Sequence, residues 1–107
     1  HGFYADRIKA AGLDLMVPDD AGRTLIHDVI FGELCQGKVL DTSRERVLAL
    51  IEAARAAGAD CVILGCTEIC LLLDPDALPL PGFDSTAIHA AAAVDFALGA
   101  AAASKAA

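Results

Sequence analysis

A thiol, a hydroxyl and a carboxylate stand side by side in this sequence, at Cys66, Thr67 and Glu68. They follow the apolar run Cys61–Leu64, which predicts a strand covered on both faces. Gly65 allows a sharp backbone turn after that strand, and a helix beginning there would favour the thiolate form of Cys66. A thiolate is suited to proton abstraction or nucleophilic attack. We therefore predict that Cys66 is catalytic, with a buried structural cysteine as the alternative.

Three further side chains are predicted to bind substrate: Thr67, Glu68 and His89. Thr67 and Glu68 offer a hydroxyl, a carboxylate and backbone N–H groups that would hold a substrate carboxylate. The imidazole of His89, one turn into the last predicted helix, would orient a thiol or a substrate. The alternatives are structural: Thr67 caps a helix, Glu68 complements the helix dipole, and His89 is a packed or solvated side chain.

Cofactor and metal sites have little support in the sequence. Cys61, Cys66, Cys70 and His89 could be imagined around zinc, but their spacing lacks the close cysteine pairs of common zinc modules. Neither of the glycine-rich phosphate-binding motifs occurs. We therefore expect no metal and no cofactor. With Cys35, the four cysteines fit reduced thiols in a cytoplasmic enzyme better than a disulfide-bonded secreted domain.

Helices and strands alternate along the chain in a way that positions these residues. The predicted order is helix Phe3–Ala11, strand Leu13–Val17, a helix capped by Asp19 or Asp20 and ended by Gly37, a helix opened by a capping box at Thr42–Glu45 and ended by Gly58, strand Cys61–Leu64, a short helix to Leu73, strand Leu78–Leu80, and a helix capped by Asp84 or Ser85 and reaching Leu98. This order predicts an α/β fold, a three-layer parallel sheet with helices on both faces.

The length and the net charge of the chain exclude several classes of function. The 107 residues make one domain, 1–107, of which 99–107 are expected to be a frayed tail. The net charge of −7 argues against nucleic acid and against an anionic membrane surface as partners. No apolar run reaches the roughly 18 residues of a membrane span. Because the sequence begins at His1, without an initiator Met or a signal-like segment, we expect an internal start within a longer protein.

Three segments together resemble a known family, the aspartate/glutamate racemases. The segment Gly58–Ile69 ends in Gly-Cys-Thr-Glu-Ile and is similar to the family's second catalytic-cysteine segment. Phe83–Ala90, followed by Ala93-Val94-Asp95, resembles the family's closing loop and helix. Ile30–Gly37 is similar to the helix end that precedes the family's long amphipathic helix. In this order, the three segments identify the chain as the carboxy-terminal half of such a racemase.

The resemblance implies a two-domain fold with the active site between two similar α/β domains. Each domain supplies one acid/base group, typically a cysteine, and no metal, pyridoxal phosphate or nucleotide takes part. Cys66 matches the second cysteine, and Thr67 matches a residue that contacts the substrate carboxylate. The implied partners are an amino-acid substrate, an amino-terminal domain that is missing here, and a second subunit in a homodimer. The chain alone is then expected to be inactive.

Other functions remain open on the sequence alone. Cys35 stands where some members carry a lysine that holds an acidic side chain, so the preferred amino acid is undetermined. Maleate isomerases, arylmalonate decarboxylases and hydantoin racemases share paired cysteines on this fold, although the Gly-Cys-Thr-Glu segment favours amino-acid racemases. A non-catalytic α/β module that binds a small carboxylate or self-associates is the alternative from another class.

Overall fold

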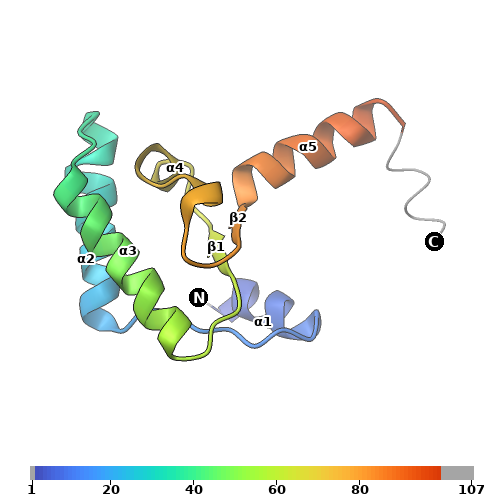
Figure 1. Ribbon diagram of the computed structural model, residues 1–107. Coiled ribbons are helices and arrows are strands. Elements are labelled where there is room, and N and C mark those ends of the chain that lie inside the picture. The colour runs from blue at the N-terminus through green and yellow to red at the C-terminus, as the bar shows by residue number, and fades with distance from the viewer. Residues whose placement is uncertain (1, 100–107) are drawn as a thin grey trace.

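The computed structural model describes residues 2–99, and the greater part of the predicted tail 99–107 lies outside them. The elements are α1 (Gly2–Ala10), α2 (Asp20–Gly32), η1 (Leu34–Gln36), α3 (Asp41–Ala56), β1 (Val62–Leu64), α4 (Ile69–Leu72), η2 (Pro75–Ala77), β2 (Gly82–Asp84) and α5 (Ser85–Ala97). Here η denotes a short 3₁₀ helix. Figure 1 shows α2 and α3 together on one side of the small sheet, and α5 leaving it on the other side.

The sheet consists of β1 and β2, which run parallel with Ile63 opposite Phe83. A parallel pair needs a crossover connection, and α4 with η2 supplies it. The α/β class and the parallel sheet are therefore confirmed. The predicted number of strands is wrong, because the described residues form two strands and not three.

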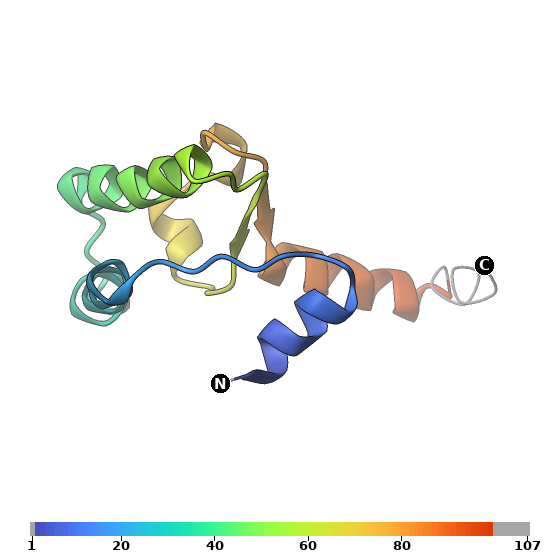
Figure 2. The same cartoon turned by 90° about the horizontal axis from the view of Figure 1, so that it is seen from below.

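The segment Leu13–Val17, predicted to be a strand, is extended but pairs with no other strand in the described part of the chain. Its side chains are exposed, and Figure 2 shows the segment crossing beneath the sheet as a single unpaired length of chain. The prediction of a strand here is wrong, although the composition of the segment is that of a strand. A strand also requires a neighbour for its N–H and C=O groups, and no described segment lies in that position.

The second strand begins later than predicted. Leu78–Leu80 is not a strand, because Pro79 and Pro81 cannot donate to a ladder, and β2 starts only at Gly82. A Cβ atom at Gly82 would lie 2.8 Å from the backbone oxygen of Pro75. The close approach of η2 to the strand therefore explains why glycine stands at this position.

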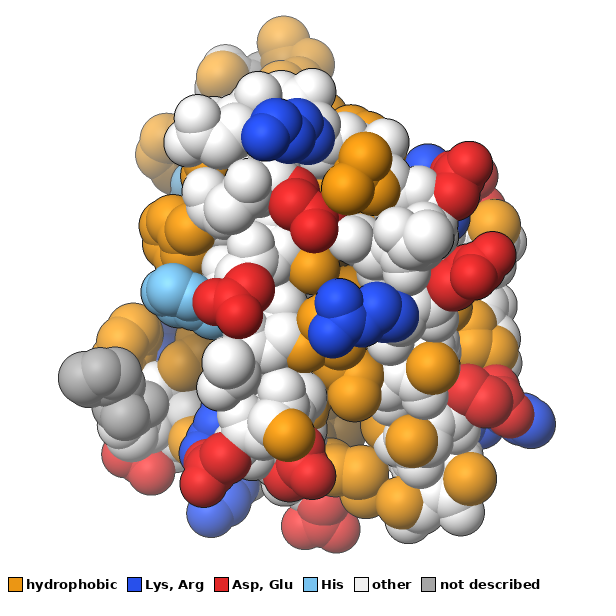
Figure 3. Space-filling model, turned by 90° about the vertical axis from the view of Figure 1, so that its left-hand side faces the viewer, with side chains coloured by type: hydrophobic (Ala, Val, Ile, Leu, Met, Phe, Trp, Pro, Cys, Tyr) orange, Lys and Arg blue, Asp and Glu red, His pale blue; other side chains and the backbone are white. Residues whose placement is uncertain are grey.

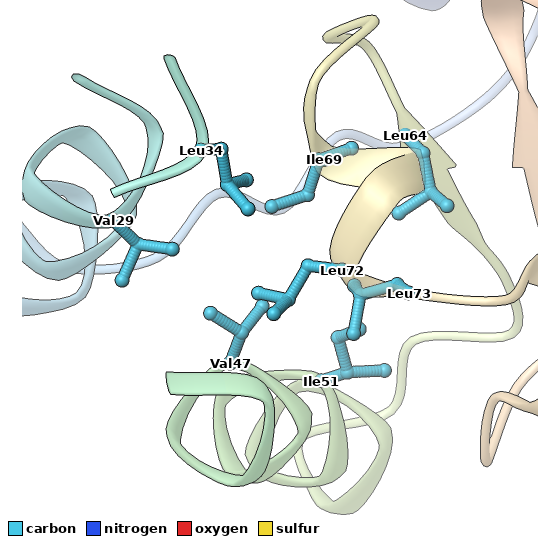
Figure 4. Packing of buried hydrophobic residues seen from close by; sticks show 8 residues of the cluster. All are labelled: Val29, Leu34, Val47, Ile51, Leu64, Ile69, Leu72 and Leu73. Atoms are coloured by element: carbon cyan, nitrogen blue, oxygen red, sulfur yellow. The ribbon is translucent and has the colours of Figure 1, made fainter. Parts of the chain in front are cut away.

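The core lies on one side of the sheet and contains eight buried hydrophobic residues. Figure 4 shows them converging from α2, η1, α3, β1, α4 and the residue after it: Val29, Leu34, Val47, Ile51, Leu64, Ile69, Leu72 and Leu73. Val47 and Ile51 lie one turn apart on α3, as the helical periodicity predicted. The opposite face of β1 is not covered, since Ile63 is 37% exposed, so the prediction of a strand covered on both faces is wrong.

Of the predicted helix caps, the one that begins α2 is present and the one predicted for α3 is not. Asp19 caps α2 by accepting a 2.8 Å hydrogen bond from Gly22 N–H, as predicted. The predicted capping box at Thr42–Glu45 does not form, because α3 already begins at Asp41 after an extended Leu40. The first-turn carboxylate of Asp41 pairs with Arg44 instead. The predicted helix ending at Gly37 is divided into α2 and η1, and Gly37 closes η1 with φ of +74°.

The two terminal helices contrast with the core. Neither α1 nor α5 buries a residue, and Figures 1 and 2 both show α5 extending away from the rest of the molecule. Val94, Phe96 and Leu98 are exposed on or just after α5 although they are apolar. A helix that is apolar around its circumference is normally buried in a larger protein. None of the helices in residues 2–99 has the length and apolar character needed to cross a membrane.

Candidate functional site

The loop that follows β1 lies beside the end of β2 because the two strands are parallel. Ser85, the first residue of α5, donates a 3.0 Å hydrogen bond from its hydroxyl to the backbone oxygen of Leu64. This contact brings the start of α5 next to the Gly65–Glu68 loop. In open parallel sheets the carboxyl ends of the strands form the usual ligand-binding edge. The topology therefore places the predicted chemistry at that edge.

Cys66 is half-buried and packs against the margin of the hydrophobic core. Its sulfur is not enclosed by apolar atoms, because the thiol donates a hydrogen bond to Glu68 Oε2 at 3.1 Å. A thiol held in this way is fixed in orientation and still reachable from outside. The side chain thus contacts the core on one side and a carboxylate on the other.

Thr67 and Glu68 join Cys66 in one hydrogen-bonded group. The exposed Thr67 donates its hydroxyl to the same oxygen, Glu68 Oε2, at 2.6 Å. The hydrogen bond from Thr67, followed by that from Cys66, lowers the pKa of the Glu68 carboxyl below its ordinary value. Glu68 is therefore ionised at neutral pH and accepts from both neighbours. The three adjacent residues predicted from the sequence thus converge on one oxygen atom.

The helix after this loop is shorter than the predicted one. α4 begins only at Ile69 and has four residues, with Glu68 at its N-cap. A helix dipole is the sum of aligned peptide units, so a single turn contributes little. The sequence-based expectation that a helix N-terminus favours a thiolate at Cys66 has correspondingly little support.

The sequence interpretation missed a second thiol–carboxylate contact at the same edge. Asp84 caps α5 by accepting from the N–H groups of Thr86 at 2.9 Å and Ala87 at 3.2 Å. The bond from Ala87 lowers the Asp84 pKa most, and the nearby Cys70 thiol lowers it further. Burial raises the pKa of Cys70, and Asp84 raises it further. The only signal in the sequence was the position of Cys70, four residues after Cys66.

His89 has no contact with this group in the structure. The ring is exposed on α5, and no hydrogen bond or ion pair involves it among residues 2–99. It lies one turn after Ser85 and so shares the helix face that begins at the site. The topology therefore brings His89 towards the same edge without joining it to the thiol.

The site is open on this chain. Two surface hollows lie elsewhere: one of about 430 Å³ between α2 and α3, and one of about 500 Å³ between α3, α4 and η2. Cys66 lines neither of them, whereas Cys70 lines the second. Figure 3 shows the outer face of α2 and α3, where charged side chains of both signs are interspersed with hydrophobic ones. In the described part of the chain, no three His, Cys, Asp or Glu side chains are grouped as metal ligands would be.

The arrangement can move protons. A reachable thiol beside an ionised carboxylate can give up a proton to a substrate atom, and the resulting thiolate can take one back. The backbone N–H of Thr67 makes no hydrogen bond within residues 2–99, so it can donate to a substrate oxygen. These groups would contact one face of a bound substrate. The opposite side would face away from this domain.

Known proteins are similar to this chain in sequence and in fold. The sequence matches the Asp/Glu/Hydantoin racemase family over residues 1–93. A crystal structure from Yersinia pestis, provisionally described as an Asp/Glu racemase, is similar with a TM-score of 0.84 and 41% sequence identity. The alignment covers 92% of this chain and 43% of that one, so this chain spans less than half the length of the Yersinia protein. The agreement in sequence and in fold shows that this chain belongs to the Asp/Glu/Hydantoin racemase family.

Proposed function

We propose that this chain is one half of a cofactor-independent amino-acid racemase that interconverts L- and D-amino acids by two-base proton transfer, with Cys66 as one of the two bases. The observation that carries the proposal is the position of Cys66. Its half-buried, reachable thiol lies at the carboxyl edge of a parallel sheet, within a loop that resembles the racemase cysteine segment.

Inversion of a carbon centre needs two proton-transfer groups on opposite faces of the substrate. One group removes the α-proton, and the other delivers a proton to the opposite face. The described residues offer Cys66 on one side only, so we propose that a companion domain closes the site and supplies the second group. The extra length of the Yersinia protein is consistent with such a domain. So are the exposed apolar side chains of α5 and of the outer sheet face.

The substrate class follows from the donors at the loop. The backbone N–H of Thr67, which makes no hydrogen bond within residues 2–99, suits one oxygen of a carboxylate, which every α-amino acid carries. Negative charge develops at Cα as the proton leaves, and pre-oriented donors near the carboxylate stabilise it. Four free cysteines are consistent with a reducing compartment, and we propose that the protein works in the cytoplasm.

Deuterium uptake tests the proposed activity. The complete protein, meaning this chain with its proposed companion domain, is incubated in D₂O with L-aspartate, L-glutamate and a panel of other amino acids. Proton NMR should show exchange at Cα, and chiral chromatography should show the D-enantiomer of at least one amino acid. The isolated 107-residue chain should show neither. No exchange with any amino acid would contradict the proposal.

The family description also includes hydantoin racemases, so a second substrate class belongs in the same assay. A 5-substituted hydantoin has an acidic carbon proton but no free carboxylate. If the complete protein racemises hydantoins and leaves amino acids unchanged, the proposed role of Thr67 as a carboxylate contact is wrong, although the two-base chemistry survives.

A further inference from the structure

Glu68 Oε2 accepts two hydrogen bonds from its own loop. The Cys66 thiol reaches it at 3.1 Å and the Thr67 hydroxyl at 2.6 Å. Glu68 is half-buried, so the carboxylate is partly shielded by the protein. A thiol can donate this bond only while it carries its proton, because a thiolate has no donor. The observed arrangement is therefore that of a protonated sulfur.

The carboxylates closest to the sulfur belong to the same end of the sheet. The titratable groups near Cys66 are Glu68 in its own loop, Cys70 on α4 and, through Cys70, Asp84 at the end of β2. Both carboxyl groups have lowered pKa values and are ionised at neutral pH. Neither forms an ion pair in the described part of the chain. A thiolate at Cys66 would add a further negative charge to an acidic environment without a compensating cation from this domain.

We infer that Glu68 is a positioning residue that holds Cys66 as a protonated thiol, so that Cys66 begins the reaction as the proton donor. The inference rests on the proposed function and gives Glu68 a different role from the substrate contact that the sequence predicts. A carboxylate that already accepts two hydrogen bonds and repels a substrate carboxylate is poorly suited to bind one. It is well suited to aim an S–H bond.

In the proposed reaction, one proton leaves Cα and another is delivered to Cα on the opposite face of the amino acid. The group on the companion domain removes the α-proton from one face of the amino acid, which leaves the electron pair at Cα. The S–H bond of Cys66 then breaks as a new C–H bond forms on the opposite face. Cys66 is left as a thiolate beside Glu68, and the companion group is left protonated. The companion group then releases its proton to solvent, and Cys66 takes one from solvent, which the repulsion between the thiolate and Glu68 favours and which restores the starting state. In the reverse direction the same two groups exchange roles, and the Cys66 thiolate removes the α-proton.

Alkylation of Cys66 by iodoacetamide reads its protonation directly, because only the thiolate reacts. The complete protein and its Glu68→Gln variant are alkylated between pH 6 and 10, and the Cys66 peptide is quantified by mass spectrometry. At pH 7 the variant should react roughly tenfold faster, the size expected when one neighbouring like charge is removed. The midpoint of its pH profile should move to lower pH. Glu52→Gln, on α3 and paired with Arg55, is the matched control and should leave both quantities unchanged.

A second variant guards against a folding defect in Glu68→Gln. Thr67→Val removes the other donor to Oε2 and keeps the carboxylate, so the negative charge next to Cys66 is less neutralised. Alkylation of Cys66 should then become slower, opposite to the effect of Glu68→Gln. Equal rates in all variants, or slower alkylation in Glu68→Gln, would overturn the inference.

Failure of this inference can be told apart from failure of the proposed function. Alkylation reports on Cys66 whether or not a substrate is known. If Cα exchange occurs and Glu68→Gln leaves the alkylation profile unchanged, only the role of Glu68 is wrong. If the alkylation profile shifts as expected and no substrate exchanges, the pairing of Glu68 with Cys66 stands and the racemase proposal fails.

Discussion

The two halves of this molecule contain similar apolar residues and differ in what covers them. α2, α3 and α4 enclose the hydrophobic core, whereas α1 and α5 bury none of their residues. The contrast continues within the sheet: Leu64 points into the core, while its neighbour Ile63 and the paired Phe83 remain exposed on the opposite face. Apolar sequence therefore predicts which surfaces are suited to burial, and the partner determines whether burial occurs.

The functional loop lies at the boundary between these halves. Ile69 and Leu72 anchor α4 in the packed half, and Ser85 ties the loop to the start of α5 in the open half. A rigid core thus holds Cys66 at the edge of an uncovered surface. This is the arrangement that a site shared between two domains requires.

The largest effect is expected in the packed half, from Leu72→Ala. Leu72 is 2% exposed, and truncating a buried leucine costs about 2–5 kcal/mol of the free energy of unfolding. Its neighbour Leu71 is 60% exposed, so Leu71→Ala should cost less than about 0.5 kcal/mol. Urea unfolding of both variants gives the comparison. Equal losses would mean that the two halves are not distinguished by packing as described.

The next effect concerns the open half. If a companion domain covers the outer sheet face, Phe83→Ala in the complete protein should cost about 2 kcal/mol, the value of burying a large apolar side chain. Phe31→Ala on α2, where the side chain is 59% exposed, serves as the control and should be nearly neutral. Guanidinium unfolding curves decide between them. A neutral Phe83→Ala would place that face in solvent even in the complete protein.

A smaller effect is expected where the halves meet. Asp84→Ala removes the cap of α5, so Tm should fall by a few degrees. Asp74→Ala removes one bond to Asp76 N–H at the start of the three-residue η2 and should have a smaller effect. Differential scanning calorimetry measures both. The reverse order would mean that α5 is not held to the sheet through Asp84.

The smallest effect is on the pH dependence of stability. The folded-state pKa of Asp84 is lowered, chiefly by the bond from Ala87 N–H, so its contribution is present above the ordinary value of about 3.9 and is lost as pH falls through the lowered value. Asp84→Asn should therefore lose less stability than the unmodified protein between pH 6 and pH 3. Unfolding curves at the two pH values provide the test.

The sequence predicted local features well. The Asp19 cap of α2 and the end of α3 shortly before Gly58 depend on residues a few positions apart, and both are present in the structure. Such features are set by backbone geometry and nearby side chains, which a sequence displays directly.

Most of the features that the sequence did not predict depend on distant parts of the chain. Leu13–Val17 has strand composition but finds no partner among residues 2–99. Cys70 on α4 and Asp84 at the end of β2 influence each other's pKa. No spacing in the sequence predicts that these two residues lie close together. The capping box failed for a local reason, because the helix began before it and Asp41 occupied the first turn. Pairing and contacts between elements are therefore the information that required a structure.

The rate of racemisation of the complete protein with and without the Cys66 sulfur tests the central claim most directly. Cys66→Ser should lower the rate by at least about 10²-fold, since a positioned acid/base group contributes that much or more. Cys35→Ser, at an exposed cysteine on η1, should retain the original rate. Polarimetry with the best substrate from the D₂O panel gives both values. Equal rates for the two variants would contradict the assignment of Cys66 as an acid/base group.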